Sequence, residues 1–305
     1  AMVASTMTAF SAFADDDETG NGINDAVPIS FNKVVSGNIT NHDNDWYSFS
    51  LDTPGKLNIT VDITNSNNTD KCYEIVDADN NDTTLFTSDN FTNTTLRNVV
   101  YLSAGNYYIH FYSGDWAGCN YDMKIVNTPT EESFDSKSNN NIGKASAVEF
   151  DTEYTGQISA NDDADYYTFE VAEEGMVTFN FDGDLENVDW KIYNSDKEAV
   201  ESGTFSKADT DDAISAMKSY VMTAGTFTLG ITKNGESCGN YTLSLDYLKD
   251  YNNRAVSGVF ACVDVTKDGF IDARDAGAIL SYYAYLSTGG KETDFNVWYE
   301  TEFAE

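Results

Sequence analysis

Six residues that can bind a metal ion through oxygen lie within a twelve-residue segment near the C-terminal end of the chain. They occupy positions one, three, five, seven, nine and twelve of the segment: Asp264, Thr266, Asp268, Phe270 through its carbonyl, Asp272 and Asp275. Gly269 at position six allows a sharp turn, and Ile271 at position eight is apolar. Because Ca²⁺ takes roughly six to eight oxygen ligands, this spacing predicts a calcium-binding loop. A solvated acidic loop is the alternative.

A second segment alternates aromatic and imidazole side chains. With a period of two, Tyr108, His110 and Tyr112 share one face of a predicted β-strand. The equivalent positions of an internal repeat, about 120 residues later, carry Thr228, Gly230 and Thr232. Sugars stack their C–H faces on aromatic rings, so this difference predicts a carbohydrate-binding surface on the first copy of the repeat. The predicted ligand-binding residues are Tyr108, His110, Tyr112, Asp115, Trp116 and Asn120.

The alternative for this face is packing against a neighbouring domain. The other tryptophans have structural interpretations. Trp46 aligns with Tyr166, and Trp190 with Tyr73, which indicates positions where any aromatic residue suffices. Trp298 is expected to anchor the C-terminal tail.

The calcium loop and the residues after it resemble the dockerin repeat of cellulosome-type assemblies, and the stretch from 279 to 290 is similar to the second repeat of gut Ruminococcus-like dockerins. Dockerins bind cohesins through the helix that follows the loop, so the resemblance implies a cohesin partner. The implied contact residues are Ala273, Arg274, Ala276, Ile279, Leu280 and Tyr283. Dockerins normally carry two loops and this sequence contains one. A half-dockerin that packs on the preceding domain is therefore the alternative.

Four short motifs recur in the same order with an offset of about 120 residues, which is typical of a duplicated domain. The pairs are GNIT at 37–40 and GQIS at 156–159, DWYSF at 45–49 and DYYTF at 165–169, SAGNY at 103–107 and TAGTF at 223–227, and NY at 120–121 and 240–241. The repeat predicts two copies of one domain, at 15–128 and 129–247. A C-terminal segment, 248–305, follows them.

Apolar residues alternate within each copy. In copy one they predict three strand faces: Tyr47, Phe49 and Leu51; Leu57, Ile59, Val61 and Ile63; Tyr107, Ile109 and Phe111. Turn signals such as Pro54-Gly55 and Asn234-Gly235 separate the runs. The pattern predicts an all-β fold of two tandem antiparallel β-sandwich, jelly-roll-like domains, followed by a small calcium-loop and helix segment.

The repeated motifs resemble the bacterial pre-peptidase C-terminal (PPC-like) domain, which has an Asp-x-Tyr-x-Phe strand, a Gly turn, an Ala-Gly-x-Tyr strand and a closing Gly-x-Tyr strand. Members are sandwiches attached to secreted enzymes, and some bind polymers such as collagen or glycans. The resemblance implies an accessory binding role without catalysis. Some members also bind calcium near the domain start, a layout that resembles Glu131, Glu132, Asn139, Asn140, Asp162 and Asp163 in copy two. Solvated acidic loops are the favoured interpretation of these residues.

The four cysteines predict two disulfide bonds in an exported protein. Cys72 and Cys119 both lie in copy one and form the first predicted pair. Cys238 is then left for Cys262, a bridge that would fasten the calcium segment to copy two. That bridge requires the two Cα atoms to lie within about 7 Å.

The charge and the first residues bound the class of protein. Seventeen Lys and Arg oppose 51 Asp and Glu, and the formal charge of −34 disfavours nucleic acids and anionic membrane surfaces as partners. The sequence VASTMTAFSAFA at 3–14 matches the end of a secretory signal, so residues 1–14 are interpreted as a signal-peptide remnant with residues 1–2 left from cloning. No apolar stretch is long enough for membrane insertion.

Together these features predict a secreted, monomeric, non-catalytic carbohydrate-binding protein with calcium as its cofactor. Its polysaccharide would be starch or a plant glucan, and its dockerin-like segment would recruit it to a cohesin-bearing scaffold at the cell surface, as in a cellulosome or amylosome. Catalysis is not expected, because the chain has two His and contains neither Gly-x-Ser-x-Gly nor His-Glu-x-x-His. The alternative is an adhesion or structural protein whose sandwiches act as spacers or bind a protein partner.

Overall fold

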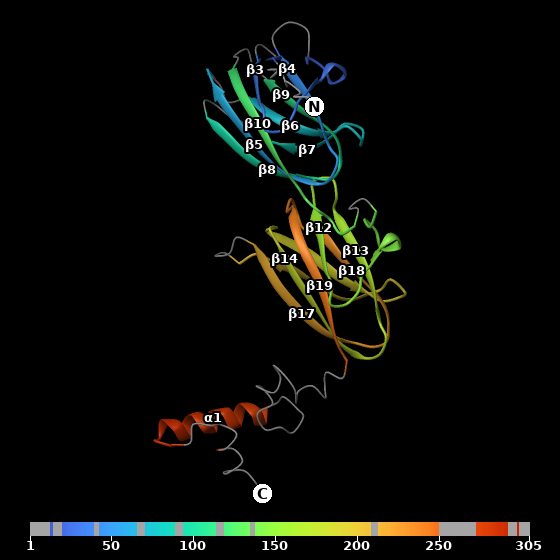
Figure 1. Ribbon diagram of the computed structural model, residues 1–305, viewed down its shortest axis with the longest axis vertical. Coiled ribbons are helices and arrows are strands. Elements are labelled where there is room, and N and C mark those ends of the chain that lie inside the picture. Colours follow the sequence, from blue (N-terminus) through green and yellow to red (C-terminus); the bar gives the residue numbers. More distant parts are fainter. Residues whose placement is uncertain are drawn as a thin grey trace, which may run out of the picture. The chain divides into compact units, whose positions relative to one another are not determined.

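The computed structural model describes residues 13–14, 20–39, 43–65, 71–88, 94–113, 119–134, 138–208, 213–249, 273–291 and 298 (Figure 1). This part of the chain contains nineteen β-strands, two short 3-10 helices and one α-helix. The prediction of an all-β fold is therefore confirmed. No helix within the described ranges is long and apolar enough to cross a membrane.

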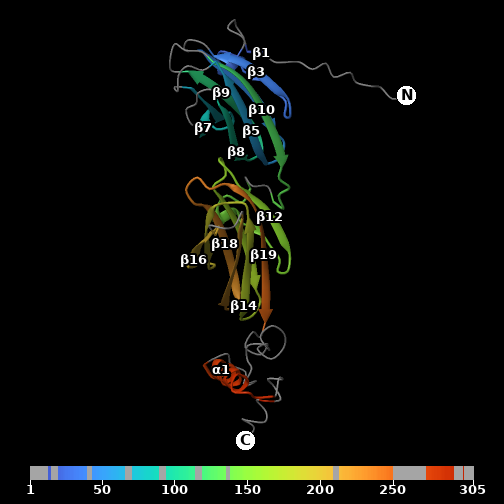
Figure 2. The ribbon, with the colours of Figure 1, turned by 90° about the vertical axis from the view of Figure 1, so that its left-hand side faces the viewer.

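Two five-stranded sheets form the first sandwich (Figure 2). One has the order β1 (Phe13–Ala14), β3 (Val34–Ile39), β10 (Cys119–Pro129), β5 (Gly55–Thr64) and β8 (Thr95–Leu102). The other has the order β2 (Val27–Pro28), β4 (Asn44–Leu51), β9 (Gly105–Ser113), β6 (Lys71–Asp77) and β7 (Thr83–Thr87). Neighbouring strands are antiparallel except where β1 and β2 each add a two-residue parallel pair at a sheet edge.

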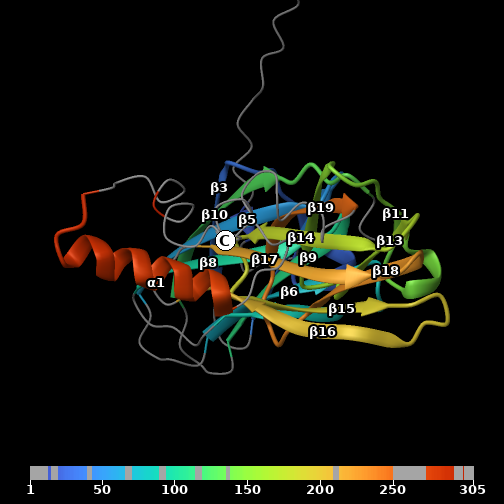
Figure 3. The ribbon, with the colours of Figure 1, turned by 90° about the horizontal axis from the view of Figure 1, so that it is seen from below.

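Two further sheets form the second sandwich. One has the order β11 (Ser146–Ala147), β13 (Ala164–Val171), β18 (Gly225–Lys233), β15 (Asn187–Tyr193) and β16 (Ala199–Ser206). Figure 3 shows these strands in this spatial order. The other has the order β12 (Glu153–Ile158), β19 (Gly239–Lys249), β14 (Gly175–Gly183) and β17 (Ile214–Met222). The 3-10 helices Ile23–Asp25 and Ile142–Lys144 occupy equivalent places in the sequence, directly before β2 and β11.

By spatial proximity the chain groups into two compact units. The first comprises 1–169, 179–217 and 226–245, and the second comprises 170–178, 218–225 and 246–305. The predicted domain boundaries at 15–128, 129–247 and 248–305 stay predictions.

The alternating apolar residues lie where the sequence predicts. Tyr47, Ile59 and Ile109 are fully buried, and the other residues of the three predicted faces are buried with them. Gly235 has a φ of +62° in a turn, as the Asn-Gly signal indicates. Period two places these side chains between the two sheets of the first sandwich, because successive side chains of a strand point to opposite faces.

A buried polar cluster explains why the motifs repeat. Tyr121 Oη donates to Asp45 Oδ2 over 2.5 Å and lies 2.8 Å from Tyr47 Oη. A Cβ atom on Gly37 would lie 2.2 Å from Tyr121 Oη, so only glycine fits beneath that ring. The second sandwich repeats the arrangement with Asp165, Tyr167, Tyr241 and Gly156. The shared motifs therefore encode a structural cluster.

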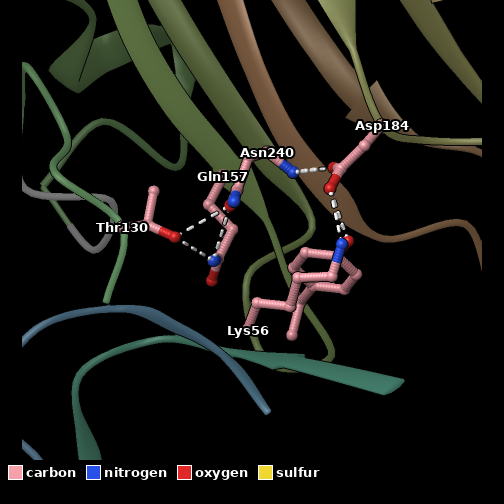
Figure 4. A network of polar contacts seen from close by, with 6 residues as sticks. Lys56, Thr130, Gln157, Asp184 and Asn240 are labelled. Carbon is pink, nitrogen blue, oxygen red and sulfur yellow. Dashed lines mark hydrogen bonds and ion pairs between the residues drawn. The ribbon is translucent and has the colours of Figure 1, made fainter. Parts of the chain in front are cut away.

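Within the first unit, polar contacts join residues of the two sandwiches (Figure 4). Asp184 Oδ2 accepts from Lys56 Nζ at 3.0 Å and from Tyr101 Oη at 2.6 Å. Asp184 Oδ1 accepts from the backbone N–H of Asn240 at 2.6 Å. The Lys56 and Asp184 side chains are each about one third exposed, so their ion pair contributes less than about 1 kcal/mol.

The helix α1 (Ala273–Ser287) leaves apolar side chains in solvent. Leu280 is 68% exposed, Tyr283 is 71% exposed, and Ile279 is also exposed. The predicted anchor Trp298 is buried, with its ring 5.1 Å from that of Tyr282. Exposed apolar residues on one helix are a feature of partner-binding helices.

Candidate functional site

The outer face of strands β4 and β9 carries a row of stacked rings. Trp46 lies opposite His110 in the register, and their rings stack with centroids 4.0 Å apart at an angle of 10°. Tyr112 stacks on the same imidazole, at 4.9 Å and 28°. Because these rings lie face to face, they cover one another's faces. The stack therefore consolidates the sheet and does not form an open, flat platform.

Tyr108 is oriented differently. Its ring meets that of Trp46 edge-on, with centroids 6.1 Å apart and an angle of 80°. Tyr108 is therefore not part of the parallel stack, and its half-buried ring lines the groove described below. The structure thus separates Tyr108 from His110 and Tyr112 in what each ring can bind.

His110 joins three strands. One imidazole nitrogen, Nδ1, lies 2.8 Å from Glu74 Oε1 on β6, and the other, Nε2, lies 2.8 Å from Asn44 Oδ1 on β4. Burial lowers the pKa of His110, and the hydrogen bond to Glu74 opposes that shift. With both nitrogens engaged and two rings stacked on the imidazole, His110 links strands β4, β6 and β9.

A groove of about 390 Å³ begins at Tyr108, and we call it the Tyr108 groove. Its volume falls within the range of small-ligand sites. Its lining comes from β2, β4 and β9, with Ile29 after β2 and Ala78 after β6: Pro28, Ile29, Ser48, Phe49, Ser50, Ala78, Asn106, Tyr107 and Tyr108. The groove therefore combines the Tyr108 ring with hydroxyl and amide groups.

At the matching positions the second sandwich has neither the Tyr108 ring nor the His110 imidazole. Thr228 replaces Tyr108, and Gly230 replaces His110. A Cβ atom on Gly230 would lie 2.8 Å from the Tyr166 ring, so glycine makes room for that ring to lie over the strand. The two copies therefore share a scaffold and differ on this outer face.

The predicted ligand residues do not all meet. Tyr108 lines the groove, while His110 and Tyr112 belong to the stack beside it. Asn120 lies on β10 of the other sheet, where its Oδ1 accepts from Asn38 Nδ2. Asp115 and Trp116 lie outside the described residues.

Sequence reasoning assigned Trp46 to structural filling and missed Ser48, Ser50 and Asn106. Trp46 and the two serines alternate out of phase with the buried Tyr47 and Phe49, which is the signal that places them on the outer face. Asn106 bears the same relation to buried Tyr107. Trp190, in contrast, is buried and stacks on Phe205 at 5.6 Å, in agreement with a structural role.

The cysteine pairings are not established. The described residues contain no disulfide bond. Cys119 begins β10, while Cys72 lies on β6 in the other sheet of the first sandwich. Burial raises the pKa of the Cys238 thiol. Cys262 and the side chain of Cys72 lie outside the described residues, so both predicted bridges stay predictions.

Most of the predicted calcium loop also lies outside the described residues, which include only the backbone of 273–275 in α1, with Asp275 the one predicted ligand among them. Among the described side chains, no group of three or more His, Cys, Asp or Glu is placed to hold a metal. Of the acidic and amide residues at the start of copy two, Asn139 and Asp162 are each 1% exposed. The interpretation as solvated loop residues is therefore wrong for these two, because they are packed inside the fold.

Comparison with known proteins gives several similar structures, and no family model matches the chain. The pre-peptidase C-terminal domain of a collagenase from Bacillus anthracis is 21% identical, over 33% of this chain and 94% of that one, with a TM-score of 0.27. The tandem CBM22 domains of Paenibacillus barcinonensis Xyn10C are 10% identical, over 71% and 91%, with a TM-score of 0.25. The periplasmic inhibitor of g-type lysozyme from Aeromonas hydrophila is 16% identical, over 37% and 99%, with a TM-score of 0.25. At such low TM-scores, none of these likenesses assigns a function to the chain.

Proposed function

We propose that this chain is a non-catalytic protein that binds polysaccharide in the Tyr108 groove. The observation that carries the proposal is that the Tyr108 ring, which is not part of the parallel stack, lines a groove together with the hydroxyl groups of Ser48 and Ser50. A sugar can stack on the ring and exchange hydrogen bonds with the polar rim. The second sandwich has the same fold without the ring, so the fold itself does not require an aromatic residue there.

Replacement of Tyr108 by Ala is expected to weaken polysaccharide binding about tenfold or more, because the stacking contribution of one ring approaches 1.5 kcal/mol. Affinity electrophoresis in gels cast with amylopectin, glycogen, xylan, glucomannan or hydroxyethylcellulose measures the effect as lost retardation. Tyr166→Ala, on the matching outer face of the second sandwich, is the control and should migrate as the unchanged protein does. Equal retardation of Tyr108→Ala and the unchanged protein would place the binding site elsewhere.

For the C-terminal segment we propose a calcium-dependent dockerin-like role with a cohesin as partner, in a secreted protein carried on a cell-surface scaffold. The exposed Ile279, Leu280 and Tyr283 on α1 support a partner for this helix, because large apolar side chains that are neighbours on one helix are typical of an interaction surface. Asp264, Thr266, Asp268, the Phe270 carbonyl, Asp272 and Asp275 would supply the calcium ligands.

Joint replacement of Asp264 and Asp268 by Ala is expected to abolish calcium-dependent protection of the C-terminal segment, because it removes two of the six proposed ligands. Hydrogen exchange of peptides from α1, with calcium and with a chelator, measures this directly. Peptides from β5 provide an internal reference. Calcium-dependent protection that persists in the double variant would show that the ion binds elsewhere, with the start of the second sandwich as the next place to test.

The same exposed residues of α1 favour a second candidate, an adhesion or structural protein that binds a protein partner and uses the sandwiches as spacers. This candidate predicts uniform mobility in every polysaccharide gel. It also predicts that Tyr108→Ala leaves partner binding unchanged.

A further inference from the structure

The hydrogen bonds beside the Tyr108 groove run in one direction. The Asp79 carboxylate can only accept when ionised, and it takes the backbone N–H of Asn106 at 2.8 Å and its side-chain Nδ2 at 3.0 Å. This fixes the amide of Asn106 with its Oδ1 facing Ser50. Ser50 Oγ donates its proton to that oxygen over 2.8 Å. The donors of these hydrogen bonds therefore all point toward Asp79, which is itself exposed.

At Ser50 and Asn106 a bound ligand consequently meets acceptors, while the Ser48 and Tyr108 hydroxyls can both donate and accept. The lone pairs of Ser50 Oγ remain available to a ligand, while its proton is engaged. The Asn106 Oδ1 acceptor is shared with that hydroxyl. A sugar hydroxyl can donate to such a rim, whereas a carboxylate or sulfate group has no proton to give.

The charges around the groove also disfavour an anionic ligand. Among the residues that the structure describes, no Lys or Arg lines the groove, and Asp79 lies next to it. Asp77, which is buried, accepts from the backbone N–H of Asp79 at 2.9 Å and adds a second carboxylate behind the rim. In a chain with a formal charge of −34, an anionic ligand would meet repulsion at the site and at longer range.

We infer that the Tyr108 groove selects uncharged, hydroxyl-rich glycans and rejects glycans that carry carboxylate or sulfate groups. The inference rests on the proposed function and specifies its ligand class. The Tyr108 ring can stack on a sugar of either charge class. The acceptors at Ser50 and Asn106 and the nearby carboxylates discriminate between neutral and anionic glycans. Negatively charged polymers lose binding for two separable reasons: charge repulsion, which salt screens, and the missing donors, which salt does not restore.

Matched neutral and anionic polymers test this. Hydroxyethylcellulose is compared with carboxymethylcellulose, and amylopectin with carboxymethyl starch, by affinity electrophoresis at low salt and by pull-down in about 0.02 M and 0.3 M NaCl. At least one neutral member is expected to bind at least tenfold more tightly than its anionic partner at low salt. At high salt the difference in binding is expected to become smaller without disappearing, because salt screens only the charge repulsion.

The variant Asp79→Asn removes the carboxylate that orients Asn106 and keeps an oxygen for its backbone N–H. It is expected to reduce the neutral-to-anionic binding ratio at least threefold, while the surface variant Asp182→Asn leaves the ratio unchanged. Since the ratio is measured within one variant, a loss of total affinity does not obscure it. Equal binding of both members of each pair by the unchanged protein overturns the inference and leaves the proposed function standing. Binding to none of the four polymers and none of the earlier panel overturns both.

Discussion

Gly156→Ala is expected to destabilise the second sandwich by about 3 kcal/mol or more. A Cβ atom on Gly156 would lie 2.4 Å from Tyr241 Cζ and 2.5 Å from its Oη. Tyr241 cannot move away cheaply, because its ring stacks on Phe181 at 5.1 Å and its hydroxyl donates to Asp165. Either the ring or strand β12 must shift, and both changes disrupt a close-packed core.

Hydrogen exchange followed by mass spectrometry measures this effect within one molecule. Peptides from β19 should lose protection in Gly156→Ala, while peptides from β10 in the first sandwich serve as the internal reference. Gly22→Ala is the matched control, since a Cβ atom there meets nothing within 4 Å. The converse substitution, Gly37→Ala, should reverse the pattern, because its Cβ would strike Tyr121. Unchanged protection of β19 in Gly156→Ala would show that the Tyr241 ring is not fixed as the structure places it.

The stability of the second sandwich is expected to fall as the pH rises from about 4 to about 7. Burial raises the pKa of Asp165 from 3.8 to about 7, although hydrogen bonds from Tyr241 and Asn139 oppose the shift. The folded state therefore holds this proton more tightly than the unfolded state. The stabilisation is fully present below the unfolded pKa and is lost as the pH rises through the folded pKa, with an upper bound on the order of 4 kcal/mol.

Asp165→Asn should remove this pH dependence, because an amide stays neutral and its oxygen can still accept from Tyr241. Urea titrations at pH 4, 5.5 and 7.5, monitored by the fluorescence of buried Trp190, measure the free energy of unfolding. Asp182→Asn, at an exposed position, should retain the slope of the unchanged protein. An equal slope in Asp165→Asn and Asp182→Asn would show that another group controls the pH dependence.

Local pattern was enough to predict the strands of the first sandwich. Tyr47, Phe49 and Leu51 are buried because a strand repeats every two residues, and that period depends only on backbone geometry. The repeat at about 120 residues could also be predicted from the sequence, since Asp45 and Asp165 belong to the same buried cluster in each copy. The chemistry of the outer face of β4 and β9 could be predicted only in part. Tyr108, His110 and Tyr112 were found as a row by their period, but a period does not give ring orientation.

The sequence by itself determined the all-β class, the duplicated cores and the strand face on which the aromatic residues of copy one lie. Only the tertiary structure decided which residues make a site. The strand register placed Trp46 opposite His110 and turned a predicted platform into a stack. It also brought Ser50 and Asn106 beside Tyr108, and assigned Asn120 to the other sheet. The reason is that side-chain alternation is a local property of one strand, whereas ring stacking, hydrogen-bond direction and grooves depend on which strands become neighbours.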